Sequence, residues 1–90
     1  MPSHKDREAC LLELSNTASD MLVGLKCLDT PEVVRVARRL KELANEYGAS
    51  MLGVTARNIE HAATAGDLGA AQLLVPELLE RLDKPLELLN

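Results

Sequence analysis

The chain has almost no aromatic side chains: among its 90 residues there is no Trp or Phe, and there is a single Tyr. Its core must therefore be built from aliphatic side chains, most of which suit helices. The strict alternation of apolar and polar residues that marks a half-buried strand is also missing. Together these absences predict an all-α protein. Ninety residues are enough for one small core, so residues 1–90 are predicted to form a single domain.

Other absences exclude several classes of function. The formal net charge is −4, which disfavours nucleic-acid binding. No apolar run approaches the ~18 residues of a membrane span, and no signal peptide is recognised, so we expect a cytoplasmic protein without a membrane partner. Cys10 and Cys27 would lie roughly 25 Å apart on one helix, which excludes a disulfide between them and predicts two small core side chains. No metal-ligand spacing or glycine-rich phosphate loop is present, so neither metal nor cofactor is expected.

Helical periodicity fills the chain. Apolar residues recur at intervals of three and four, and four segments are predicted: residues 3 to about 29, 31–47, 50–65, and 68 to the Lys84–Pro85 step. Because the connections are short, neighbouring helices must run antiparallel. The predicted architecture is an antiparallel up-down-up-down four-helix bundle.

The helix starts carry capping residues. Ser3 with Asp6 three positions later resembles a capping box. Thr30 followed by Pro31 predicts a cap and a proline at the first helical position. Asp67 is predicted to cap the fourth helix in the same manner as Thr30 caps the second.

The helix stops are glycines. Gly48 and Gly66 can adopt the left-handed conformation that ends a helix. Pro76 lies inside the fourth segment, where it removes one backbone hydrogen bond. We expect it to bend that helix without ending it.

One stretch of the second predicted helix carries a recognisable pattern. The residues concerned are Leu40, Lys41, Ala44, Gly48 and Ala49. This stretch resembles the signature of histidine phosphotransfer (HPt) domains, His-x-Leu-Lys-Gly-x-Ala/Ser-x-x-x-Gly-Ala. The resemblance extends over most of the chain, from about residue 11 onward, and includes 29–37, 56–60 and 65–71. Two positions depart from it: Arg38 stands at the position of the histidine, and Glu42 at that of the glycine.

The resemblance implies an HPt-like bundle that acts in a two-component phosphorelay. In that family the histidine accepts a phosphoryl group from a receiver domain or a kinase and passes it on. Arginine stays protonated and has no free lone pair with which to attack phosphorus. The chain is therefore predicted to be a non-phosphorylatable module, a pseudo-HPt protein and not an enzyme. Its expected partner is the receiver domain of a response regulator or a hybrid histidine kinase.

The predicted partner-binding residues lie on one flank of the second helix. With Val33 as the buried direction, they point about 80–180° away from it at about 100° per residue. They are Val34, Arg38, Lys41, Glu42 and Asn45. Lys41 is one turn from position 38, where the resemblance implies contact with phosphate oxygens. Glu42 places bulk and negative charge where an acidic receiver pocket would dock. Arg38 and Glu42 are also spaced to form an exposed i,i+4 ion pair.

Three alternatives remain open. In the first, the phosphotransfer site has decayed and the helices persist as a scaffold. In the second, the chain is an active phosphotransfer protein that uses His61, although no lysine or glycine supports that position. In the third, it is a helical adaptor or dimerisation domain unrelated to phosphorelay.

Overall fold

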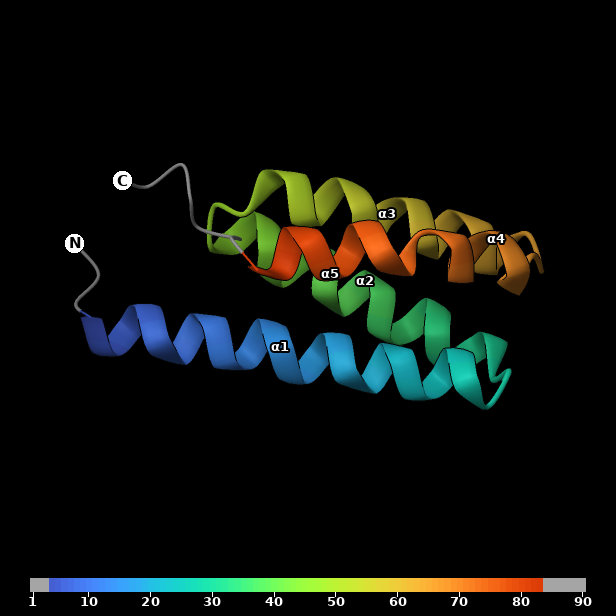
Figure 1. Ribbon diagram of the computed structural model, residues 1–90, viewed down its shortest axis with the longest axis horizontal. Coiled ribbons are helices and arrows are strands. Elements are labelled where there is room, and N and C mark those ends of the chain that lie inside the picture. Colours follow the sequence, from blue (N-terminus) through green and yellow to red (C-terminus); the bar gives the residue numbers. More distant parts are fainter. Residues whose placement is uncertain (1–3, 84–90) are drawn as a thin grey trace.

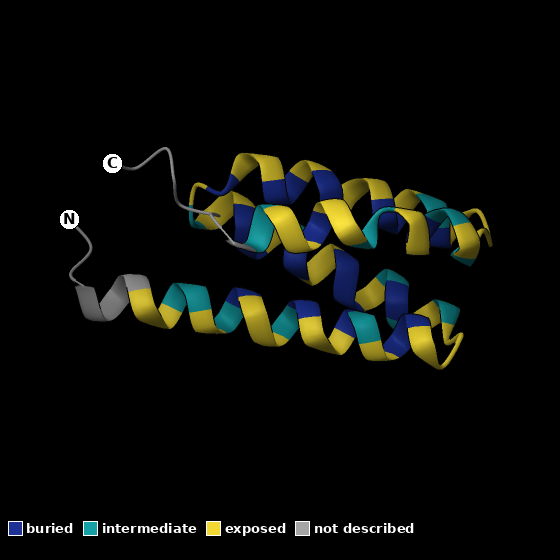
Figure 2. Cartoon of the chain, in the orientation of Figure 1, coloured by how far each residue is buried: buried dark blue, intermediate teal, exposed yellow. Residues whose placement is uncertain are grey.

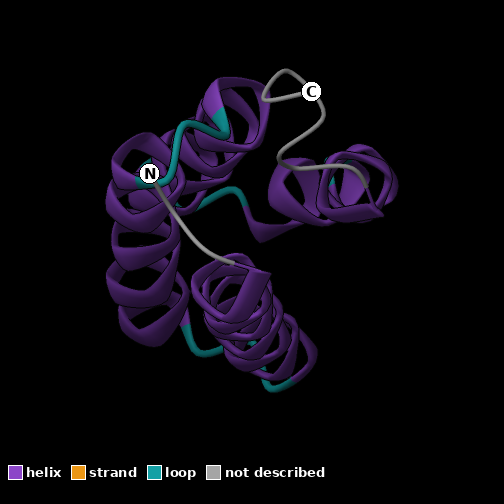
Figure 3. Ribbon diagram, turned by 90° about the vertical axis from the view of Figure 1, so that its left-hand side faces the viewer, coloured by secondary structure: helices purple, strands orange, loops and turns teal. Residues whose placement is uncertain are grey.

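The computed structural model describes residues 4–83, with side chains from residue 8 to residue 82. These residues form five helical segments and no strand (Figure 1). The segments are α1 (His4–Lys26), α2 (Thr30–Glu46), α3 (Ser50–Thr64), α4 (Leu68–Leu73) and α5 (Val75–Asp83). Figure 3 shows that only short loops separate them. The prediction of an all-α protein is confirmed for the described residues.

The core lies between the helices, and α2 and α3 form its most extensive pair. α1 packs chiefly against α2, whereas α4 and α5 lie mainly against α3. Figure 2 shows buried stripes on α1, α2 and α3, whereas α4 and α5 are mostly exposed or half-buried. The inner face predicted for α2 comprised Val33, Ala37, Leu40, Ala44 and Tyr47, of which the first four are buried and Tyr47 is half-buried. The face predicted for α3 is buried at Leu52, Ala56, Ile59 and Ala63. Helical periodicity thus identified the buried faces of both helices correctly.

The turns at the ends of α1, α2 and α3 share one backbone motif. In each, a backbone N–H donates a hydrogen bond to the carbonyl oxygen five residues earlier. Asp29 N donates to Gly24 O at 2.9 Å, and Asp67 N donates to Ala62 O at 2.9 Å. This motif requires a residue with positive φ. Gly48 and Gly66 supply it with φ of 79° and 80°, which confirms their predicted role as helix stops. At the end of α1 the same conformation falls on a leucine, Leu28, with φ of 56°.

Replacing Leu28 with glycine is expected to stabilise the protein. A side chain at positive φ is strained by about 1–2 kcal/mol, and Leu28 is 66% exposed, so little packing is lost with it. After the greater chain entropy of glycine is subtracted, we expect a gain of about 0.5–1 kcal/mol in the free energy of unfolding. Urea unfolding followed by circular dichroism measures it.

The matched control is Leu73→Gly. Leu73 is 81% exposed at the end of α4, but its backbone has no positive φ. The same substitution there should destabilise the protein by about 0.5–1 kcal/mol. Equal effects at the two leucines would contradict the strain argument.

Two helix starts were predicted with different success. Asp67 caps α4 as expected, because its carboxylate accepts a bond from Ala70 N at 2.9 Å. The cap of α2 is Asp29 and not Thr30, since the Asp29 carboxylate accepts from Glu32 N at 3.4 Å. Two further predictions fall outside what the structure describes. They are the capping box of Ser3 with Asp6 and the end of the last helix at Lys84–Pro85.

The prediction of a single bent fourth helix was wrong. The helix ends at Leu73, and a new one begins at Val75, with Pro76 in its first turn. Proline is tolerated there because the first amides of a helix have no partner within the helix. α4 and α5 therefore meet at a break between two helices.

The end of α1 also differs from the prediction. The helix stops at Lys26, so Cys27 follows it and is exposed, while Cys10 is half-buried. The prediction that Cys27 is a core side chain was therefore wrong. None of the described helices combines the length and the apolar character that crossing a bilayer requires.

Candidate functional site

α2 carries all five residues that the sequence singled out for partner binding. Pro31 and the Asp29 cap start this helix, and its buried stripe faces α1 and α3. That stripe turns Arg38, Glu42 and Asn45 outward, where they are exposed. Val34 and Lys41 lie at the border and are half-buried. The predicted flank therefore exists as a surface, and the side chains of α3 decide what each residue contacts there.

The principal contact of this flank is Glu60 on α3, which sequence reasoning did not identify. One oxygen of its carboxylate accepts a bond from Arg38 Nε at 2.9 Å. The other accepts from Lys41 Nζ at 2.9 Å. The Glu60 side chain is only 9% exposed, whereas Arg38 is 59% and Lys41 29% exposed. A carboxylate from inside the protein thus binds both cations of the signature.

This arrangement corrects the expected pairing of Arg38 with Glu42. Among the described residues, the ion pair of Arg38 is with Glu60 across the helix interface. The sequence did hold a clue, because Glu60 lies four residues after buried Ala56 and beside buried Ile59. An acid at the border of an apolar stripe needs a cationic partner when it is buried. What could not be read from the sequence was which cation would reach it.

The two cations keep Glu60 ionised. Burial raises the pKa of the Glu60 carboxyl, but the hydrogen bonds and the positive charges of Lys41 and Arg38 together outweigh burial and lower the pKa below its ordinary value of 4.5. Glu60 therefore carries a full negative charge at neutral pH. Arg38 uses only Nε in this contact, and its two η nitrogens have no hydrogen-bond partner among the described residues. The η nitrogens of its planar guanidinium are thus not used as donors within the described part of the chain.

A groove of about 680 Å³ runs beside Arg38. α2 forms most of its wall, and the C-terminal end of α3 closes one side. The lining residues are Thr30, Pro31, Val34, Arg35, Arg38, Arg39, Glu42, Ala63 and Thr64. Of the predicted residues, Val34, Arg38 and Glu42 therefore share one concave surface. Lys41 and Asn45 are not part of it.

Asn45 lies over a glycine of α3. A Cβ atom added to Gly53 would be 2.8 Å from Asn45 Oδ1, so this glycine leaves the space that the amide occupies. Asn45 is exposed, yet its carbonyl oxygen is directed against α3. It belongs to the α2–α3 seam, one helical turn beyond Lys41.

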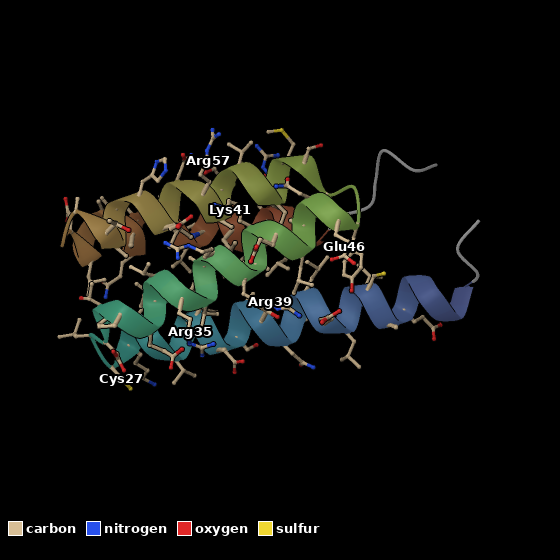
Figure 4. The ribbon with its side chains drawn as sticks, turned by 180° about the vertical axis from the view of Figure 1, so that it is seen from behind. Cys27, Arg35, Arg39, Lys41, Glu46 and Arg57 are labelled. Atoms are coloured by element: carbon tan, nitrogen blue, oxygen red, sulfur yellow. The ribbon has the colours of Figure 1, made fainter. Side chains whose placement is uncertain are left out.

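The two remaining arginines of α2 are also paired. Arg35 forms an ion pair with Glu32 on its own helix, and Arg39 with Glu13 of α1 at 3.5 Å. Glu13 in addition accepts a hydrogen bond from the Tyr47 hydroxyl, which raises the pKa of Tyr47 to about 12. Figure 4 shows Arg35, Arg39, Lys41 and Arg57 on this side of the molecule. No ion pair within the described part of the chain involves Arg57.

The other chemically active side chains do not gather into a site. His61 follows Glu60 on α3 and is exposed. Within residues 4–83, no three or more His, Cys, Asp or Glu side chains come together as metal ligands could. The flank of α2 with Glu60 beneath it is therefore the candidate site.

Comparisons with known proteins do not assign this chain to a family. No protein-family model matches it, and neither the curated proteins nor the solved structures contain a match. The class that the structure defines is an all-helical domain with a paired cationic flank. The resemblance to HPt domains therefore stays a prediction from the residues of the signature.

Proposed function

We propose that this chain is an HPt-like signalling domain without a phospho-accepting histidine, which binds the acidic pocket of a receiver domain or of a hybrid histidine kinase in the cytoplasm. In this proposal α4 and α5 together act as the fourth helix of an up-down-up-down bundle. The observation that carries the proposal is the position of Arg38. It stands at the exposed centre of α2, in place of the signature histidine, with both η nitrogens free of hydrogen-bond partners among the described residues.

The chemistry of Arg38 supports binding and not transfer. Its guanidinium is charged throughout the physiological range and has no lone pair that could accept a phosphoryl group. Two η nitrogens can instead form paired hydrogen bonds with one carboxylate of a receiver pocket. The neighbouring groove, with Val34 at its wall, offers apolar surface beside this polar contact.

The test combines binding and label transfer. Purified receiver domains from the host organism are titrated into the protein by isothermal calorimetry. In parallel, phosphorylated receivers and an autophosphorylated kinase are incubated with it, and acid-labile phosphate is measured. We expect a receiver to bind with micromolar affinity and the protein to remain unlabelled.

Other outcomes would favour the other functions. Label on His61, lost in His61→Gln, would show active phosphotransfer through that exposed residue. Failure of every receiver and kinase to bind would favour an adaptor or dimerisation domain. The exposed apolar side chains Leu12, Val23 and Leu73 would then supply the interface.

A further inference from the structure

Glu60 occupies the place of an acidic ligand. Its two oxygens each bind one of the two cations that would receive the partner's carboxylates, at 2.9 Å in both cases. Its side chain is 9% exposed and is bonded to both cations across the α2–α3 interface, so its charge lies beneath the surface that a partner would contact. Any acid that binds Arg38 and Lys41 must do so in the field of this charge.

Acidic side chains offset the positive charges on the outer face of α2. The cations are Arg35, Arg38, Arg39 and Lys41, and the acids that pair with them or share their groove are Glu13, Glu32, Glu42 and Glu60. Each of these four cations thus has an acid that pairs with it or shares its groove, and the exposed Glu46 adds a further negative charge to α2. Glu13 and Glu32 are partly exposed, so water screens them, whereas Glu60 is buried and its field is screened less. Glu60 therefore weakens the attraction for acidic groups more than the other acids do.

From this arrangement we infer that Glu60 is an internal counter-charge, which keeps the affinity of the α2 face for an acidic partner low and its complexes short-lived. The inference rests on the proposed function, since it concerns the same site and the same partner. The free η nitrogens of Arg38 still select a carboxylate by geometry. The strength of the complex is limited because Glu60 has already neutralised much of the local positive charge.

Glu60→Gln tests the inference most directly. The amide keeps an oxygen that can accept the bond from Arg38 Nε, so Arg38 stays oriented while the charge is removed. For two partner carboxylates about 6 Å away in a water-like dielectric, loss of one opposing charge corresponds to roughly tenfold tighter binding. We expect about five- to tenfold tighter binding of the same receiver domain at low ionic strength. The gain should fall below about twofold in 0.5 M salt, where the Debye length is only a few ångströms.

The matched control is Glu77→Gln on α5. It removes the same charge from an acid that pairs with Arg81 at 4.0 Å, on a helix that does not line the groove. This variant should bind the receiver as the unmodified protein does. Glu60→Asp keeps the charge and should show no gain. Circular dichroism and thermal unfolding of each variant establish that it is folded.

A second pair of variants tests the inference without Glu60→Gln. Lys41→Met leaves Glu60 to act on Arg38 alone and should weaken binding by about three- to tenfold. Adding Glu60→Met removes the counter-charge as well and should return the affinity to within about twofold of the starting protein. Replacing a buried ion pair with apolar side chains of similar volume is generally tolerated by the fold.

The outcomes separate this inference from the proposed function. Binding by the unmodified protein with no gain in Glu60→Gln, or no recovery in the double variant, would overturn the role of Glu60 alone. Binding that appears only in Glu60→Gln would support it strongly. If neither protein binds any receiver at low salt, both the inference and the proposed function fail.

Discussion

Arg38→Ala is expected to raise the Kd for the receiver at least tenfold, which corresponds to a loss of about 1.4 kcal/mol or more in the free energy of binding. The substitution removes the η nitrogens that have no partner in the described part of the chain, and with them the fork that would bind a carboxylate. It also leaves Glu60 with Lys41 as its single cation, so a small loss of stability, about 1 kcal/mol, should accompany it. Calorimetric titration with the receiver measures the first effect, and urea unfolding measures the second.

Two further variants make this test specific. Arg38→Lys retains the charge but loses the fork, and it should bind almost as weakly as Arg38→Ala if paired hydrogen bonds carry recognition. Lys26→Ala removes an exposed positive charge at the end of α1 that does not line the groove, and it should leave the affinity unchanged. An affinity that is the same in Arg38→Ala and in the unmodified protein would show that this flank is not the docking surface. The decayed-scaffold alternative would then be favoured.

Leu40→Ala is expected to lower the free energy of unfolding by about 2–5 kcal/mol. Leu40 belongs to the HPt-like signature, but its side chain is fully buried at 0% exposure, between α2 and the rest of the core. Removing three buried carbon atoms loses their transfer free energy and leaves a cavity. Since small domains have only about 5–15 kcal/mol of stability, this is a large fraction of the total.

The control for Leu40→Ala is Leu73→Ala. Leu73 is 81% exposed, so the same truncation there should change stability by less than about 0.5 kcal/mol. Urea unfolding of both variants, followed by circular dichroism, gives the comparison. A loss below about 1 kcal/mol for Leu40→Ala would contradict its position in the core. The expected result would separate the part of the signature that specifies the fold from the part that specifies a partner.

Local rules predicted the helices well where a single residue decides the outcome. α2 was predicted over 31–47 and is found at Thr30–Glu46, because Gly48 readily adopts the positive φ that the turn needs. Those rules failed at Leu28, where a leucine takes the same conformation and the helix stops earlier than its apolar pattern suggested. They failed again at Pro76, which starts a helix instead of bending one. At Leu28 the chain uses a backbone conformation that residue preference ranks low, whereas at Pro76 the structure shows the favoured use of proline at a helix start, which the continuous apolar pattern had concealed.

The candidate site was predicted only in part. The outward direction of Arg38 followed from the 3.6-residue period of α2, since Val33, Ala37 and Leu40 define the buried side. Which acid would bind Arg38 did not follow. Glu42 lies one turn away on the same helix, whereas Glu60 is on the next helix, and the structure pairs Arg38 with Glu60. A buried carboxylate has more to gain from a cation than an exposed one does, because water no longer stabilises its charge.

The sequence by itself determined the helical class, the buried faces of α2 and α3, and the glycine turns after α2 and α3. Each of these depends on the spacing of apolar residues over a few positions or on the conformational freedom of a single residue. Both follow directly from the order of the amino acids. Only the tertiary structure decided that Arg38 and Lys41 share one buried carboxylate and that Arg38 borders a groove. Those facts depend on how closely α2 and α3 approach and in what register. Packing of the whole core sets that register, and no local pattern encodes it.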